Sequence, residues 1–216
     1  DVWTLNPGVS FSRKGGENTL GAQIQEDNLF GTGRSLDFEW DDNVDRTSYG
    51  VNYLDPHFLH SFTRFGVGYT DADDGNTKSL QLDRPFYALD VRRAGGMYLF
   101  DSERNDPRYV LGKNVGEFGH REEYYEAYGG RSRGLEGRWA KRWTAGFTYE
   151  RDRFELDPLE PPAGPLPEDR TLTYPWLGFD LVEDGYQERV NQDKISRTED
   201  VLVGLHDSAR PGNYTE

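Results

Sequence analysis

The sequence predicts an all-β fold built from antiparallel hairpins, and three observations support this prediction. Short segments alternate between apolar and polar residues along most of the chain. The breaks between them are rich in Gly, Asn, Asp and Pro, the residues that favour turns. No window fits the spacing of three and four residues that an amphipathic helix needs. We expect about eleven strands, within a range of roughly ten to twelve, in one β region over residues 1–216.

The clearest alternation places Leu36, Phe38 and Trp40 between acidic residues. Successive side chains of a strand point to opposite faces, so such a segment has one apolar and one polar face. A helix over the same residues would put Asp37 or Glu39 into its apolar stripe. The same alternation is found in residues 19–27, 49–53, 65–70, 79–83 and 139–150.

The breaks between the segments predict turns and loops. Short breaks at residues 43–45 and 73–76 have the composition of hairpin turns, and residues 28–33 form a glycine-bearing connection. Two longer gaps are expected, one over residues 101–112 and one over residues 157–170. The second gap contains five prolines, which predicts an irregular loop.

Composition excludes several functional classes. Aromatic residues make up 14% of the chain, more than a disordered protein contains. A net charge of -14 argues against nucleic-acid binding, which needs a basic surface. No apolar run reaches the roughly 18 residues of a membrane-spanning helix, so a membrane-spanning form would be a β-barrel, whose strands are only half apolar. The chain has no cysteine, and therefore no disulfide and no thiolate metal site.

Two architectures satisfy the alternation, and the pattern alone leaves both open. In a soluble sandwich, the apolar faces meet in a core. In a membrane barrel, they contact lipid while the polar faces line the interior. Aromatic residues near the ends of predicted strands suit the girdles of a membrane barrel. These residues are Trp3, Tyr53, Phe58, Phe62, Phe86, Tyr87, Trp139 and Trp176.

Candidate catalytic and metal-binding patterns are present but incomplete. Residues 130–134 match the letters of the G-x-S-x-G nucleophile elbow, yet strand-like segments flank Ser132 where the elbow needs a following helix, so we interpret them as a charged turn. Residues 71–76 resemble a calcium loop, but Leu82 stands where the bidentate Glu belongs, which favours a hairpin turn. His57 and His60 have no third zinc ligand at a fixed spacing.

Asp37 and Glu39 share one strand face, as the paired carboxylates of a glycosidase would. With 39 acidic residues in the chain such pairs arise by chance, and a charged strand face more commonly faces water. Residues 118–128 carry both charge signs and several rings, which predicts an extended strand or a lumen lining. We expect no catalytic, cofactor-binding or metal-binding residues.

Several turn motifs occur in order along the chain. An acidic-Asn-Leu segment precedes a G-x-G, a D-P pair follows the next strand, and R-P-F-x-x-L opens a later hairpin. Together with the R-T-E-D segment at residues 197–200, they resemble the barrel of the BamA/TamA-type outer-membrane assembly factor superfamily, also called bacterial surface antigens. The motif residues are Asn28, Gly31, Gly33, Asp55, Pro56, Arg84, Pro85 and Phe86.

The resemblance implies an antiparallel up-and-down transmembrane β-barrel in the bacterial outer membrane, surrounded by the lipid bilayer. It implies insertion or translocation of outer-membrane protein substrates, with or without other assembly subunits, and no bond chemistry. Substrate strands would pair with an exposed edge at a seam that includes residues 3–12. Family barrels follow periplasmic POTRA domains, and we expect this chain to be roughly the first two-thirds of a barrel, or a divergent barrel, without a POTRA domain.

Two other functions stay open at this point. A soluble or surface-attached β-sandwich that binds glycan or protein through its aromatic residues would explain the mean hydropathy of -0.88 better. A passive outer-membrane pore with an acidic lumen is the third interpretation.

Overall fold

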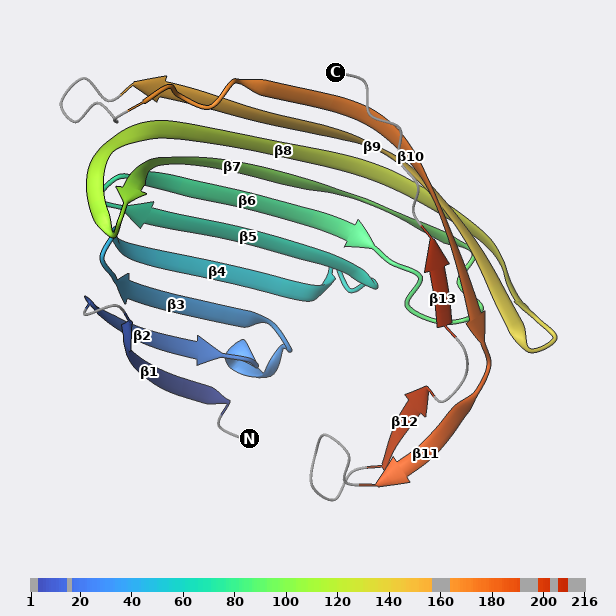
Figure 1. The fold of residues 1–216 in the computed structure, drawn as a ribbon. Coiled ribbons are helices and arrows are strands. Elements are labelled where there is room, and N and C mark those ends of the chain that lie inside the picture. The colour runs from blue at the N-terminus through green and yellow to red at the C-terminus, as the bar shows by residue number, and fades with distance from the viewer. Residues whose placement is uncertain (1–3, 15–16, 157–163, 191–197, 203–205, 210–216) are drawn as a thin grey trace.

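The computed structural model describes residues 4–14, 17–156, 164–190, 198–202 and 206–209, and these consist mainly of β-strands. In the main sheet, strands β1 to β10 are antiparallel, and each pairs with the next strand along the chain. Strand β13 continues this sheet beside β10, while β11 and β12 form a separate hairpin (Figure 1). The prediction of an all-β, antiparallel, up-and-down sheet is confirmed.

The elements follow one another along the chain with mostly short connections. In order they are β1 (Leu5–Lys14), β2 (Glu17–Glu26), the 3-10 turn η1 (Leu29–Gly31), β3 (Ser35–Asp42), β4 (Thr47–Phe58), β5 (Thr63–Ala72), β6 (Gly75–Arg84), β7 (Arg93–Val110), β8 (Lys113–Glu136), β9 (Trp139–Leu156), β10 (Arg170–Glu183), β11 (Tyr186–Val190), β12 (Thr198–Leu202) and β13 (His206–Ala209). No helix among the described residues is long and apolar enough to span a membrane.

The sheet is curved into a trough but does not close into a barrel (Figure 1). Strand β1 pairs only with β2, and the far edge of β10 pairs with β13 over Phe179–Val182 alone. A barrel needs backbone partners along both edges, and the described strands supply only this short one. The described residues therefore form a single-layer open sheet and not a closed barrel.

The pairing register separates two faces of the sheet. Val67, Leu80, Leu99 and Tyr125 are direct cross-strand partners on β5 to β8, so they share one face, and their sequence neighbours point to the other. Large apolar side chains on this first face are exposed, whereas buried polar groups such as Thr148 lie on the second. Side chains crowd together on the inside of a curved sheet, so the polar face is the concave one.

The connection between β2 and β3 is a built turn, as expected from its glycines. The side chain of Asn28 accepts a hydrogen bond from the Gly33 amide (2.7 Å), and Glu26 accepts one from the Asn28 amide (3.0 Å). Gly31 and Gly33 have φ values of 73° and 74°, in the left-handed region that favours glycine. The two glycines therefore let the chain reverse within a few residues.

The gap expected over residues 101–112 is wrong. These residues extend β7 as far as Val110, and only Leu111 and Gly112 form the turn to β8. The charges of this segment pair across the sheet, as Asp101 does with Arg121 at 3.0 Å. Paired charges on a strand face do not break the strand.

The D-P turn expected at Asp55 and Pro56 also needs correction. Both residues belong to the end of β4, at a β-bulge where the pairing with β5 shifts. Asp55 is buried and accepts hydrogen bonds from the His57 amide (2.9 Å) and from Arg34 (3.0 Å). The bulge accommodates Pro56, which has no amide to donate. The turn to β5 begins only at Leu59, directly after Phe58.

The other predicted connections agree with the structure. Residues 43–46 and 73–74 form short turns, and residues 85–92 join β6 to β7 as the R-P-F hairpin connection. Of the proline-rich loop, residues 157–163 lie outside the described part of the chain, and residues 164–169 lead irregularly into β10. Residues 118–128 belong to β8, as expected of a strand.

Side chains pack closely on the concave face around Trp176 of β10. Its Nε1 donates to Thr148 Oγ1 at 3.1 Å, and Thr148 is fully buried. Gly146 lies directly opposite Trp176 in the register. A Cβ at Gly146 would approach Trp176 Cζ2 to 2.4 Å and the Ala127 carbonyl oxygen to 2.8 Å, so glycine creates the space for the indole ring.

This packing predicts different effects for two glycines of the same sheet. We expect Gly146→Ala to lower the free energy of unfolding by about 1–3 kcal/mol, because the added Cβ overpacks against the indole. Gly129→Ala should change it by less than about 0.5 kcal/mol, since a Cβ there meets no atom within 4 Å. Denaturant unfolding followed by tryptophan fluorescence measures both variants. Equal midpoints for the two would contradict the packing role.

Candidate membrane-contact belt and concave polar face

Large apolar side chains form a continuous belt on the convex face. Val9 is 82% exposed, Phe11 68% and Phe147 50%, although all three lie within regular strands. Among the described residues, no second sheet packs against this belt. The exposed members are Val9, Phe11, Leu20, Ile24, Phe38, Tyr49, Val67, Tyr69, Met97, Leu99, Tyr125, Trp143, Phe147 and Leu177.

Charged residues border the belt on both sides. On β7, Arg93 and Asp101 flank the apolar convex positions, and on β8 Arg131 and Glu123 do the same. Each pair is eight positions apart, which corresponds to about 26 Å along a strand. The apolar band of a transmembrane β-barrel is about 25 Å tall, and tilting the strands reduces the height of this belt somewhat below that figure.

The belt crosses the strands at an angle. Direct cross-strand partners can be followed as a row from one strand to the next. The row through Phe38 on β3 contains Val51 on β4 and Tyr69 on β5, so it lies within the apolar belt on these strands. The same row then becomes charged, and reaches Arg151 on β9. On β9 the belt has moved along the strand to Phe147. Such a displacement is expected when strands are tilted relative to the belt, as barrel strands are.

Aromatic pairs lie at the borders of the belt. Tyr125 and Tyr149 stack with ring centroids 5.7 Å apart, next to the charged Glu123–Arg151 pair. Phe62 and Tyr87 stack at 4.0 Å between the β4–β5 turn and the β6–β7 connection. The two stacks lie toward opposite ends of the strands.

Two of the residues predicted for these girdles lie elsewhere. Trp176 is buried on the concave face, and Phe86 packs across Gly130, where a Cβ would come within 2.8 Å of the ring. Arg142 lies over the Phe86 ring at 5.3 Å. Sequence position near a strand end did not reveal which face each ring occupies. Trp3 lies outside the described residues.

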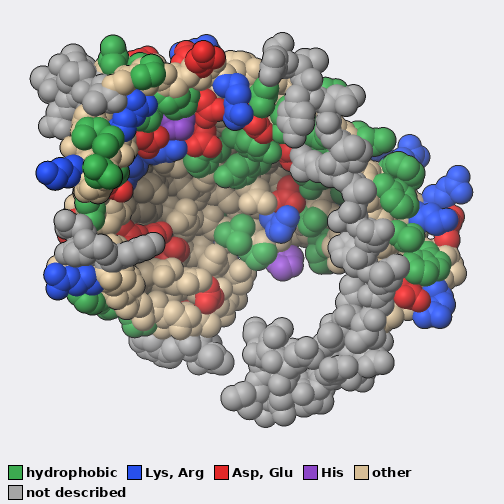
Figure 2. All heavy atoms as spheres, viewed as in Figure 1, with side chains coloured by type: hydrophobic (Ala, Val, Ile, Leu, Met, Phe, Trp, Pro, Cys, Tyr) green, Lys and Arg blue, Asp and Glu red, His purple; other side chains and the backbone are tan. Residues whose placement is uncertain are grey.

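The concave face is polar and internally hydrogen bonded. Figure 2 looks into the hollow of the sheet, where acidic side chains and polar surface are exposed. Glu126 accepts hydrogen bonds from Tyr124 and Thr148, both at 3.0 Å, and Tyr174 donates to Glu150 at 2.6 Å. These contacts link β8, β9 and β10 along the inner surface.

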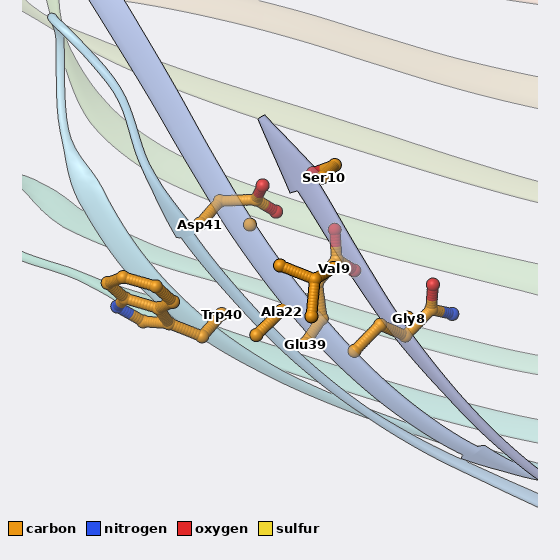
Figure 3. Close-up of a pocket in the computed structure, with 9 residues that line it drawn as sticks. Gly8, Val9, Ser10, Ala22, Glu39, Trp40 and Asp41 are labelled. Atoms are coloured by element: carbon orange, nitrogen blue, oxygen red, sulfur yellow. The ribbon is translucent and has the colours of Figure 1, made fainter. Parts of the chain in front are cut away.

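A small hollow of about 280 Å³ opens on this face near β1 (Figure 3). Gly8, Ser10 and Gly21 leave the space, and Glu39 and Asp41 stand beside it. In Figure 3, Trp40 points to the opposite side of β3 from Asp41, as strand alternation requires. The acidic strand face found in the sequence is therefore directed into the trough.

A charged cluster occupies the concave face beyond the belt. Arg104 contacts Asp106 at 3.0 Å and Glu122 at 3.2 Å. The ring of His120 lies 2.8 Å from Asp106 through Nδ1 and 3.2 Å from Asp152 through Nε2. Burial lowers the pKa of Arg104, but the two carboxylates more than offset this and raise it above its ordinary value. The guanidinium therefore stays charged.

The geometry of this cluster suits cross-linking of strands rather than acid-base catalysis. Both nitrogens of His120 face carboxylates, and its ring stacks on Phe154 at 4.5 Å, so neither nitrogen is open to a substrate. Among the residues that the structure describes, no group of three or more His, Cys, Asp or Glu side chains could hold a metal ion.

The other chemical patterns found in the sequence are structural. Ser132 lies inside β8 and not in a turn, and its Oγ donates to the Lys141 carbonyl (2.8 Å) and accepts from the Gly134 amide (3.0 Å). Gly134 has a φ of 86° at a bulge in β8. His57 and His60 flank the end of β4. The residues Asp73 and Asp74 form a plain two-residue hairpin turn.

The motif turns of the sequence lie together at one end of the sheet. The ion pair Arg34–Asp55 joins the Asn28–Gly33 turn to the D-P segment at 3.0 Å. The Phe62–Tyr87 stack then joins the next turn to the connection that follows Arg84 and Pro85. Up-and-down topology places every second connection at the same end, so three motifs far apart in sequence become neighbours (Figure 1).

Sequence reasoning missed the Arg104–His120 cluster and the glycines that receive Phe86 and Trp176. The sequence carried no alternation signal for the cluster, because Asp101, Glu103 and Asn105 are as polar as the Ser102, Arg104 and Asp106 that they separate. The sequence alone therefore predicts a gap over residues 101–112. The glycine contacts depend on distant strands and leave no local signal.

Comparisons with known proteins give no relative for this chain. No protein-family model matches the sequence, and neither a curated protein nor a solved structure is significantly similar to it. The resemblance of the turn motifs to outer-membrane assembly factors therefore stays a prediction.

The charged cluster predicts a clear difference between two arginines. Arg104→Ala leaves Asp106 and Glu122 without their main cation, and we expect it to lower the free energy of unfolding by about 1–3 kcal/mol. Arg133→Ala should change it by less than about 0.5 kcal/mol, because Arg133 is 86% exposed and lies 3.9 Å from Glu136. Denaturant midpoints measure both. A larger loss for Arg133 would contradict the role of the cluster.

Proposed function

We propose that this chain forms part of the wall of a transmembrane β-barrel in the bacterial outer membrane. Lipid covers the convex belt, and the polar concave face lines an aqueous lumen. The single observation that carries the proposal is the continuous apolar belt, bounded on both sides by charge and inclined to the strands. A soluble sandwich would bury this face against a second sheet, and the described residues contain none that does so.

The exposed area argues in the same direction. Soluble monomers rarely expose apolar patches larger than a few hundred Å² without a partner. Each large side chain left in water forfeits about 1.5–3 kcal/mol of burial free energy. A belt that includes Phe11, Phe38 and Phe147 gains that energy in a bilayer, while the hydrogen-bonded polar groups stay on the concave side.

Within this proposal, the finer function is insertion or translocation of outer-membrane proteins. The resemblance of the turn motifs supports it, and so does the gathering of these motifs at one end of the sheet. The outer edge of β1 has no strand partner among the described residues. Lipid does not tolerate an open edge, so a strand of the same protein, of another assembly subunit or of a substrate pairs there.

A second candidate is a passive pore, which a specific observation favours. Asp37, Glu39 and Asp41 follow one another on the concave side of β3, beside the hollow near β1. Rings of acidic side chains favour cations in aqueous channels. Single-channel recordings separate the candidates, because a pore conducts steadily with cation preference, whereas an assembly factor needs no constant conductance.

Membrane insertion is tested by a pair of neighbouring substitutions. Phe38→Arg places a charge in the middle of the belt, and we expect it to destabilise the folded form in lipid vesicles by about 2–4 kcal/mol. Glu39→Arg adds the same side chain on the concave face and should cost less than about 1 kcal/mol. Urea titration in vesicles, with the heat-modifiable gel band as the readout of folding, measures both.

The following results would contradict the membrane barrel. The full-length protein would fold as a monomer in water without detergent, would not float with vesicles, and would respond alike to the two substitutions. In that case the belt would contact something other than lipid.

The assembly function is tested by locking the seam. A disulfide engineered between β1 and the last strand of the complete barrel should impair insertion of a substrate barrel into vesicles, and a reducing agent should restore it. The matched control carries Ser12→Cys and Thr19→Cys. Their disulfide joins two positions that already pair between β1 and β2. Unchanged insertion with the seam locked would rule out the seam mechanism and leave the pore.

A further inference from the structure

The convex belt contains an apolar groove at its charged border. The groove has a volume of about 400 Å³ and runs over strands β5 to β8. Its walls are apolar side chains, and its charged end is formed by Lys78 and Asp101. The apolar side chains are Val67, Tyr69, Leu80, Leu99 and Tyr125.

The register explains why a groove forms here. Leu80 and Leu99 stand in one cross-strand row between the taller ring of Tyr125 on one side and Val67 on the other. The next row brings Tyr69, Lys78 and Asp101 side by side. Leu80 and Leu99 are shorter than the Tyr125 ring beside them and the Tyr69 ring in the next row, and they leave a channel that leads toward the lysine.

Lys78 carries a positive charge with no fixed partner. Its ammonium forms no ion pair with any described residue, whereas the nearest carboxylate of its row, Asp101, is paired with Arg121 at 3.0 Å. The Tyr69 hydroxyl donates to Asp71 at 3.3 Å, so that carboxylate is occupied as well. The groove therefore combines an apolar channel with an end where the Lys78 ammonium, which forms no ion pair with a described residue, lies beside the Asp101–Arg121 pair.

We propose that this groove binds one phospholipid, with an acyl chain between the tyrosine rings and the lipid phosphate on the Lys78 ammonium. The proposal rests on the membrane location proposed above and adds a specific lipid site to it. Charge complementarity decides the occupant: a phosphate at the headgroup level meets the Lys78 ammonium, Asp101 at the same end is paired with Arg121, and apolar side chains line the channel that leads away from them. The chain has a net charge of -14 and repels anionic surfaces as a whole, so the attraction at Lys78 is local.

The test uses the full-length protein in detergent micelles with dioleoyl phosphatidylglycerol, and native mass spectrometry counts the lipids retained. We expect Lys78→Ala to weaken retention about fivefold, which is the effect of one cation near a lipid headgroup. Lys141→Ala removes the same charge from the opposite border of the convex face and should leave retention unchanged. Leu80→Phe fills the groove without changing charge, and should also weaken retention.

Dioleoylglycerol, which lacks the phosphate, is the matched probe and should be retained weakly by every variant. Equal retention by the Lys78→Ala and Lys141→Ala proteins, or equal retention of the two lipids, would overturn the lipid site. Vesicle flotation of each variant tests the membrane location separately from the lipid site. If the proteins float normally, only the lipid site fails, whereas a chain that does not float removes the membrane location and the lipid site together.

Discussion

The antiparallel register of the sheet, which is continuous through the apolar belt, is the constraint on which the other features depend. Each strand pairs with its sequence neighbours, so the parity of a residue decides which face it occupies. The three bulges, at Asp55, Pro107 and Ser132, lie near strand ends and beyond the belt. A bulge within the belt would turn later side chains onto the wrong face. Confining bulges to the ends keeps one face apolar from β1 to β10.

This constraint also reconciles a polar composition with a large apolar surface. Only alternate residues contribute to the belt, and only over about eight positions of each strand, so mean hydropathy stays low. Beyond the belt, charges on the convex face pair across strands, as Arg121 does with Asp101. On the concave face, cross-strand contacts such as Arg104–Glu122 hold the long strands β7 and β8 together where no second layer supports them.

Complementary glycines and rings shape the inside of the trough. Trp176 fits over Gly146, and Phe86 fits over Gly130, where any side chain would collide with the ring. Phe86 comes from the connection between β6 and β7, which therefore folds over the concave face instead of extending from the sheet. Arg142 fixes this connection by donating to the Ala88 carbonyl at 3.2 Å. The trough is thus narrowed at the end where the motif turns gather.

The sequence by itself determined the strands, their faces and most of the turns, because alternation and turn composition are local properties. Leu36, Phe38 and Trp40 could be assigned to one face from their spacing alone, and Gly31 and Gly33 marked a turn that needs positive φ. Only the tertiary structure decided the inclination of the belt, the meeting of Phe86 with Gly130 and the His120 cluster. These depend on the register between strands and on side chains from distant strands, and no local pattern specifies either.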